Sequence, residues 1–174
     1  SEIKKLQDKG EVSVTKKGGH IAAWFGPVDY EYTGSKHKAK DLPPVIKSLK
    51  DAVEDSLGKP RDYYDSVLIN VYEPGIELKA HQDSEQILRL ADGTVGSVGT
   101  LSLGGTSIVE ILFNGRVIET HEVKDGHIYE FPAGDFQDTY FHGVGPSKKK
   151  RISLTFRKTS FSEGPVTGSL QERM

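Results

Sequence analysis

The hydrophobic positions follow a helical period early in the chain and a strand period after it. Residues 43–57 begin with two prolines and end before a glycine, and their apolar side chains recur at helical spacing: Ile46, Leu49, Val53 and Leu57. Proline fits the first turn of a helix and glycine its C-terminal cap. The pattern therefore predicts one helix over residues 43–57.

The later apolar positions form short stretches separated by turn-forming pairs such as Asn114-Gly115 and Asp125-Gly126. Stretches of this length and composition predict strands, over residues 66–73, 99–103, 107–113, 117–123, 127–131 and 151–157. Many short strands after one helix favour a mainly β (α+β) domain, an antiparallel barrel or jelly roll with a helix outside. Residues 93–105 carry five glycines without a phosphate-loop ending, which predicts turns and a flexible lid.

Composition narrows the chemistry. The 174 residues fit one domain, and the absence of cysteine excludes disulfide frameworks, thiolate catalysis and Cys-based zinc sites. No apolar run approaches the roughly 18 residues of a membrane span. The first residues lack the apolar segment of a signal peptide, which predicts an intracellular protein of the cytoplasm or nucleus. We also expect a monomer.

The net charge of −2 gives no overall attraction to nucleic acid. Basic residues nevertheless cluster at Lys16-Lys17, at 36–40 and at 148–151, and such patches can contact phosphates. Taken alone, each cluster is more typical of a solvated surface.

His81-Gln82-Asp83 offers the first candidate metal ligands. Side chains alternate in an extended segment, so His81 and Asp83 point to the same face. One more histidine would complete a triad of two histidines and one carboxylate, which leaves coordination positions open for a cosubstrate and oxygen. The remaining histidines are His20, His37, His121, His127 and His142.

His142 is the third ligand that we predict, because a strand bearing two arginines follows it. Along residues 151–157 the polar side chains share one face and the apolar ones the other: Arg151, Ser153, Thr155 and Arg157 against Ile152, Leu154 and Phe156. The apolar face suits packing on the helix, which turns both arginines inward, and buried arginines need anions. At about 20 Å apart, they can close onto the two carboxylates of 2-oxoglutarate.

Asn70 and Tyr72 also alternate onto one face, and their amide and phenol groups can hydrogen-bond the same cosubstrate. Each motif has an ordinary alternative, since most His-x-Asp sequences bind nothing and a strand with two arginines is usually a solvated edge. The joint order Asn-x-Tyr, His-x-Asp, His and Arg-x5-Arg on successive predicted strands favours a non-haem Fe(II), 2-oxoglutarate-dependent dioxygenase.

With these motifs in place, the sequence resembles the AlkB family of nucleic-acid dealkylating dioxygenases from about residue 20 to 158. The resemblance is carried by Ala23-Trp24-Phe25-Gly26, Tyr30-Glu31-Tyr32-Thr33-Gly34, residues 68–75, His81-Gln82-Asp83-Ser84-Glu85, His142-Gly143-Val144 and residues 151–157. It implies a double-stranded β-helix (jelly roll) with supporting helices and a nucleotide-recognition lid. We expect a single dioxygenase domain over residues 1–158, with the lid at about 10–40 and the core at about 64–158. Residues 159–174 are expected to form a polar tail.

The resemblance also implies roles for individual residues. His81, Asp83 and His142 would hold Fe(II), and 2-oxoglutarate would contact Asn70, Tyr72, Arg151, Ser153 and Arg157. The substrate-binding residues would be Tyr32, which stacks on the target base, with Trp24 of the lid, Glu85 near the damaged base, and Lys16 and Lys17 on phosphates. Tyr32 could instead be a core aromatic of the lid, and Glu85 a surface carboxylate.

The implied reaction is oxidative demethylation of N-alkylated bases, of the N1-methyladenine and N3-methylcytosine type, in single-stranded DNA or RNA. It consumes O2 and 2-oxoglutarate and releases succinate, CO2 and formaldehyde. His20 departs from the arginine that relatives often carry there. Val12-Ser13-Val14 stands where duplex-acting relatives have a bulky wedge, which disfavours duplex substrates. Two alternatives stay open: hydroxylation of a protein side chain or an undamaged base, and a catalytically silent jelly-roll binding module.

Overall fold

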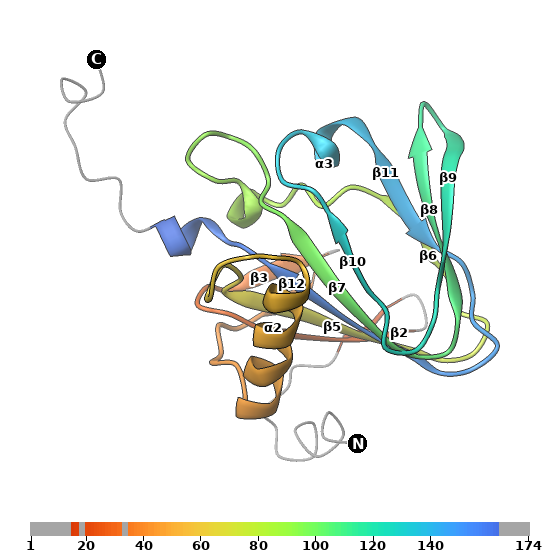
Figure 1. Cartoon of the computed structure of the whole chain (residues 1–174), viewed down its shortest axis with the longest axis horizontal. Helices are drawn as coiled ribbons and strands as arrows, with labels where there is room; N and C mark the ends of the chain where they lie inside the picture. Colours follow the sequence, from red (N-terminus) through yellow and green to blue (C-terminus); the bar gives the residue numbers. More distant parts are fainter. Residues whose placement is uncertain (1–14, 18–19, 33–34, 164–174) are drawn as a thin grey trace.

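The computed structural model describes residues 15–17, 20–32 and 35–163, and its centre is a pair of antiparallel sheets (Figure 1). The larger sheet has six strands in the order β1 (Thr15–Lys17), β2 (His20–Phe25), β5 (Ser66–Tyr72), β12 (Arg151–Arg157), β7 (Val98–Gly104) and β10 (Ile128–Phe131). The smaller has four, in the order β6 (Leu78–His81), β11 (Phe141–Val144), β8 (Ser107–Phe113) and β9 (Arg116–Val123). A separate hairpin pairs β3 (Tyr30–Tyr32) with β4 (Ser35–His37). The architecture is the predicted jelly roll.

The helix predicted over residues 43–57 is confirmed as α2 (Pro44–Ser56), which follows Pro43 as its N-cap. Short helical turns are α3 (Phe136–Thr139), η1 (Gln86–Leu88) and η2 (Ser160–Glu163). The strands predicted at 107–113 and 151–157 have the predicted bounds, and four other predicted strands differ by one residue at one or both ends. Residues 164–174 of the expected tail lie outside the described part of the chain.

β12 separates the main hydrophobic core from the interior between the sheets. Leu154 and Phe156 point out of the jelly roll and pack with Ile46 and Val53 of α2, as the alternation along the strand predicted. Ile152 packs on the same cluster but is only partly buried. The other face of β12 carries Arg151, Ser153 and Arg157, each at most 4% exposed. The strand therefore joins the stabilising core directly to a polar interior.

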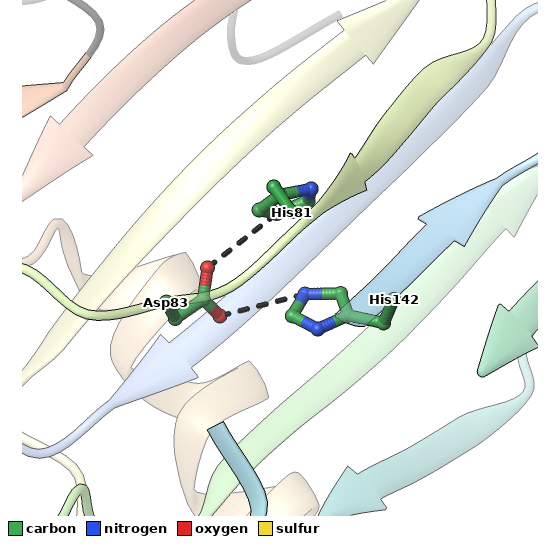
Figure 2. Close-up of side chains that lie close together, drawn as sticks. All are labelled: His81, Asp83 and His142. Carbon is green, nitrogen blue, oxygen red and sulfur yellow. Dashed lines mark ion pairs between the residues drawn. The ribbon is translucent and has the colours of Figure 1, made fainter. Parts of the chain in front are cut away.

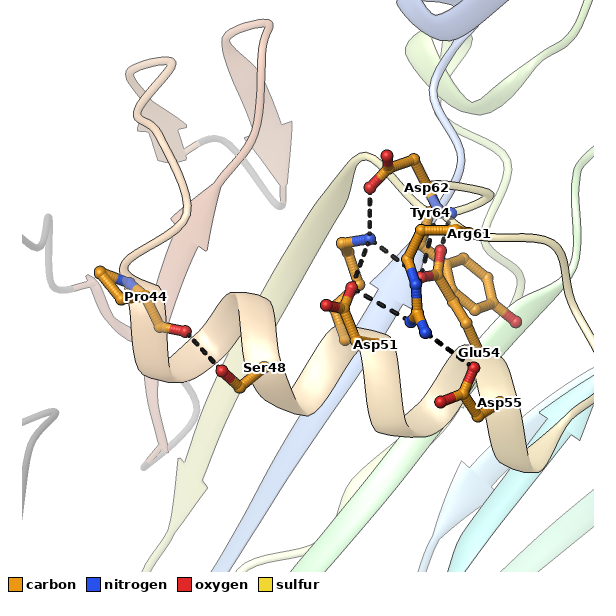
Figure 3. Close-up of polar contacts among 9 residues, drawn as sticks. Pro44, Ser48, Asp51, Glu54, Asp55, Arg61, Asp62 and Tyr64 are labelled. Atoms are coloured by element: carbon orange, nitrogen blue, oxygen red, sulfur yellow. Dashed lines mark hydrogen bonds and ion pairs between the residues drawn. The ribbon is translucent and has the colours of Figure 1, made fainter.

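A buried ion pair fixes the C-terminal half of α2 to the loop that follows it (Figure 3). The Nζ of Lys50 lies 2.9 Å from Oε1 of Glu54, one turn along the helix, and both side chains are buried. The Glu54 carboxylate also accepts the backbone N–H groups of Tyr64, at 3.0 Å, and Asp62, at 3.3 Å. A buried carboxylate is tolerated when its oxygens are paired in this way. The network therefore sets where the chain enters β5.

The expectation of turns and a flexible lid over residues 93–105 is wrong for most of that stretch. Residues 98–104 form β7, which is hydrogen-bonded on both sides, to β12 and to β10. Gly99 is closely packed against two side chains: a Cβ at this position would lie 2.7 Å from the Tyr64 hydroxyl and 2.9 Å from Leu57. Small residues in this strand therefore reflect tight packing beneath α2.

Candidate metal centre and cosubstrate pocket

The three predicted metal ligands come together between the sheets (Figure 2). His81 ends β6 and His142 lies in β11, and the two are direct partners in the antiparallel register. Asp83 follows β6 by two residues, and Figure 2 shows one oxygen of its carboxylate paired with each imidazole ring. One ligand atom from each residue lies within 4.8 Å of the other two. This is the geometry of a site that binds one metal ion through two histidines and one carboxylate.

Hydrogen bonding orients His81 for this role. Its Nδ1–H donates to the backbone carbonyl of Lys79 at 2.8 Å, and its Nε2 faces Asp83, 3.5 Å from Oδ1. Metal-binding histidines usually donate their second ring nitrogen to a carbonyl or carboxylate in this way, which fixes the tautomer and the ring plane. On the other side, the Nε2 of His142 lies 3.7 Å from Oδ2 of Asp83.

The charges of Asp83 and His142 suit a cation. Burial by itself would raise the pKa of Asp83, but the Arg157 guanidinium and the two histidines hold that pKa well below its usual range. Burial lowers the pKa of His142 to about 4, so its imidazole is neutral at physiological pH. Burial would also lower the pKa of His81, but the carboxylate of Asp83 outweighs it and raises that pKa. An ionised carboxylate beside a neutral imidazole is what a divalent metal requires.

Arg157 connects the metal site to the predicted lid. Its Nη2 lies 3.5 Å from Oδ2 of Asp83, and its Nη1 donates to the Tyr30 hydroxyl at 3.2 Å. The Tyr30 hydroxyl in turn donates to Oε1 of Glu85 at 2.9 Å. A continuous polar chain thus runs from a metal ligand to the hairpin β3–β4.

Arg151 lies at the other end of the same wall. It is 2% exposed, its Nε donates to the Ser102 hydroxyl at 2.9 Å, and its guanidinium lies over the ring of Tyr72. One arginine is therefore at the metal end of β12 and the other at the far end. All eight predicted metal and cosubstrate residues line one cavity: Asn70, Tyr72, His81, Asp83, His142, Arg151, Ser153 and Arg157.

This cavity fits a metal ion and a polar cosubstrate. Within the described part of the chain, several of its buried polar atoms lack a hydrogen-bond partner: Asn70 Oδ1, Asp83 Oδ1, His142 Nδ1 and Arg151 Nη2. Buried polar atoms are nearly always paired in folded proteins. The unpaired donors and acceptors are of the kinds that a metal ion and a dicarboxylate would satisfy.

Comparison with known proteins agrees with this geometry. The family described as "2OG-Fe(II) oxygenase superfamily" matches residues 3–157. The chain belongs to the 2OG-Fe(II) oxygenase superfamily. As a member it is a dioxygenase that uses Fe(II), 2-oxoglutarate and O2, and His81, Asp83 and His142 form its iron-binding motif. The fold agrees with a solved structure titled "The structure of OsALKBH1", with a TM-score of 0.62 and 18% identity over 85% of this chain and 80% of that one.

Curated relatives of this oxygenase include viral replication proteins. An "RNA replication polyprotein" of Apple stem pitting virus is 31% identical over 140 residues, 79% of this chain and 6% of the relative. "Replicase protein 1a" of Grapevine leafroll-associated virus 3 is 27% identical over 143 residues, 81% of this chain and 6% of the relative. "RNA replication protein" of Papaya mosaic potexvirus is 27% identical over 141 residues, 79% of this chain and 8% of the relative. The chain thus spans less than a tenth of these relatives.

The predicted substrate-binding residues of the oxygenase lie in different settings. Trp24 is buried, its indole N–H donates to the Val28 carbonyl, and its ring stacks on Tyr30 with centroids 4.3 Å apart. Glu85 accepts the Tyr30 hydroxyl. Tyr32 lies in β3 and Lys16 and Lys17 in β1, but their side chains are outside the described part, as are Val12-Ser13-Val14.

Two residues of this oxygenase were missed from the sequence. Tyr30 occupies the junction between lid and metal site, where Tyr32 was singled out for the substrate. The sequence offered Tyr30 and Tyr32 as alternating residues of one strand, but this alternation did not indicate which of the two lies next to the metal site. Gln137 accepts the backbone N–H of Asp83, and a lone glutamine in a polar stretch gave no signal.

In the described residues, no helix is long and apolar enough to cross a membrane. The location in cytoplasm or nucleus and the monomeric state stay predictions.

Proposed function

We propose that this oxygenase demethylates N-alkylated bases, of the N1-methyladenine and N3-methylcytosine type, in single-stranded nucleic acid. The observation that carries the proposal is the polar chain from Asp83 through Arg157 and Tyr30 to Glu85. It links the hairpin β3–β4 to a metal ligand, and we therefore place the target base against this hairpin. Oxidative attack requires that the methyl group lie close to the metal.

The surroundings of Tyr30 suit a flat, cationic ring. A cleft of about 380 Å³ lies between the hairpin and the segment after Asp83, and is lined by Asp29, Tyr30, Glu31, Lys36, His37, Lys38, Glu85, Gln86 and Ile87. Carboxylates and aromatic faces both attract the positive charge of a methylated base. The second oxygen of Glu85 is buried and has no hydrogen-bond partner in the described residues. It is therefore available to accept a donor from the base.

Basic residues beside the cleft provide phosphate contacts. Lys36 and Lys38 are exposed on either side of the buried His37. A strand drawn into the cleft by its base would pass these ammonium groups with its backbone. We further propose that Lys16 and Lys17 extend this track and that Tyr32 stacks on the base.

RNA is the strand that we propose. The support comes from relatives named as an RNA replication polyprotein and an RNA replication protein. Single strands are favoured over duplexes because Val12-Ser13-Val14 offers no bulky apolar wedge to fill the gap left by a flipped base.

The residues of this chain divide the work. When bound, Fe(II) with 2-oxoglutarate and O2 supplies the oxidation of the N-methyl group, and the resulting hemiaminal releases formaldehyde. Arg151 and Arg157 grip the two carboxylates of 2-oxoglutarate, and Asn70, Tyr72 and Ser153 orient it by hydrogen bonds. Trp24 stacks on Tyr30 and so helps to hold the Tyr30 hydroxyl against Arg157.

The test is turnover on a panel of single-stranded oligonucleotides, RNA and DNA, each with one methylated base. Mass spectrometry of the bases and a succinate assay are read together. We expect O2-dependent succinate coupled to loss of the methyl group from N1-methyladenine or N3-methylcytosine, with RNA ahead of DNA. Succinate formed without demethylation of any oligonucleotide would reject the proposed substrate and favour the protein or undamaged-base hydroxylase.

A further inference from the structure

The metal ligand Asp83 has an unusual backbone position. It lies in the loop after β6, beyond the last residue that pairs with β11. The sheet ladder that fixes His81 and His142 therefore does not fix Asp83. Its backbone N–H donates instead to a side chain, the Oε1 of Gln137, at 2.9 Å.

Gln137 is buried at a position from which its side chain reaches Asp83. It lies in α3, the turn that leads into β11 and so to His142, and its side chain is 1% exposed. Its hydrogen bond spans 54 residues of sequence and joins the segments that carry Asp83 and His142. Burying a glutamine costs free energy, and here the cost is partly offset: the Oε1 of Gln137 accepts the Asp83 N–H, whereas its Nε2 has no hydrogen-bond partner in the described residues.

α3 is itself held from two other sides. Arg89 forms a two-pronged ion pair with the exposed Asp138, the residue after Gln137. Ahead of α3, the backbone N–H of Gly134 donates to the Val95 carbonyl at 3.0 Å. Gln137 is therefore presented from a turn that is anchored independently of Asp83.

We propose that Gln137 is a positioning residue of the metal centre, which holds the backbone of Asp83 so that its carboxylate meets both histidines. It touches neither metal nor substrate and acts through Asp83. The inference rests on the iron site of the proposed function and not on its nucleic-acid substrate. Hydrogen-bond partners behind metal ligands are commonly worth about 10-fold to 100-fold in metal affinity.

Anaerobic titration of the apoprotein with Fe(II) tests this inference. Gln137→Met fills a similar volume without an acceptor, so Fe(II) should bind about tenfold more weakly, while the melting temperature of the apoprotein changes little. Gln137→Glu keeps an acceptor oxygen at the same reach and should recover most of the affinity. Asp138→Asn is the matched control on the same turn, because it removes the charge of the exposed pair but keeps an oxygen that can accept from Arg89, so α3 stays anchored and the Fe(II) affinity should equal that of the parent.

Two results would overturn the proposal: Fe(II) binding by Gln137→Met as tight as that of the parent, or an equal loss in Asp138→Asn. If Gln137→Met does not fold, Gln137→Asn replaces it, since its amide is one methylene too short to reach Asp83, and unchanged Fe(II) affinity there rejects the inference. The titration contains no oligonucleotide. A failure of the proposed substrate would therefore leave this result unaffected.

Discussion

Arg157 and Asp83 lie 3.5 Å apart, between Nη2 and Oδ2, inside the cavity that holds the metal ligands. An arginine expected from the sequence to grip only 2-oxoglutarate thus also keeps a metal ligand ionised. Its substitution has two consequences, one for the cosubstrate and one for the metal.

Arg157→Lys should weaken 2-oxoglutarate binding although the charge is kept, because the planar, forked donor is lost. The loss of one charged hydrogen bond is worth about 1.5–3 kcal/mol, so the KM for 2-oxoglutarate should rise at least about tenfold. Ile152→Val, on the opposite face of the same strand, is the control and should leave this KM unchanged. An unaltered KM in Arg157→Lys would show that its guanidinium does not contact the cosubstrate.

His81→Ala, Asp83→Ala and His142→Ala should each abolish turnover while the circular dichroism spectrum stays that of the folded protein. Two histidines outside the triad serve as controls: His121 is exposed and pairs with Glu119, and the ring of His127 accepts the backbone N–H of Lys124. Their alanine variants should keep the iron affinity of the parent. Full activity in any of the three triad variants would remove that residue from the metal site.

Leu154→Ala should lower the free energy of unfolding by about 2–5 kcal/mol, the usual cost of emptying a buried leucine site, since Leu154 is 2% exposed in the core beneath α2. Ile152→Ala should cost less, because Ile152 is only partly buried. Urea denaturation measures both. The ranking is contradicted if Ile152→Ala proves the more damaging.

Glu54→Ala should cost about 1–3 kcal/mol, because the buried backbone N–H of Tyr64 loses its acceptor. Lys50 would lose its buried partner but keep Asp62 and Asp51, at 3.0 and 3.3 Å. Asp55→Ala, which removes one exposed partner of Arg61, should leave the unfolding free energy almost unchanged. Thermal melts of the two variants measured together test this difference in stability. Equal melting temperatures would contradict the prediction that Glu54→Ala is the more destabilising change.

Tyr32→Ala should lose roughly 1–3 kcal/mol of oligonucleotide binding, the usual worth of a base–aromatic stack, whereas Tyr32→Phe should be tolerated. Replacing Lys16 and Lys17 should flatten the salt dependence of binding without changing lesion preference. Fluorescence titrations at several salt concentrations separate the two effects. If Tyr32→Ala binds methylated RNA as well as the parent does, Tyr32 is not the stacking residue, and Tyr30→Ala becomes the next variant to measure.

The sequence was sufficient where the chemistry follows a strand period. Along β12 the alternation of Arg151, Ile152 and Ser153 predicted both the packed face and the polar face, because side chains in a strand must alternate. The same rule placed His81 and Asp83 on one side. These residues needed no knowledge of distant segments.

The sequence was insufficient to predict the role of a residue that depends on contacts with residues distant along the chain. The five glycines of residues 93–105 suggested turns and a flexible lid, although residues 99–103 were also predicted to form a strand. Gly99 lies within that strand, and its small size is required by Tyr64 and Leu57. β6 and β11 are four residues each, too short to show a pattern. The role of Gln137 depends on its hydrogen bond with Asp83, and no local sequence pattern relates the two residues.

The direct pairing of His81 with His142 has a consequence for biosynthesis. Iron needs both histidines, and the cosubstrate needs Arg151 and Arg157, which are made still later. A nascent chain that ends before β11 holds only two of the three metal ligands, so productive iron loading must wait until the last strands have docked. Contacts of such long sequence separation also form slowly. Iron uptake by refolding protein should therefore lag behind the formation of α2. The rate of this uptake would report when the jelly roll closes.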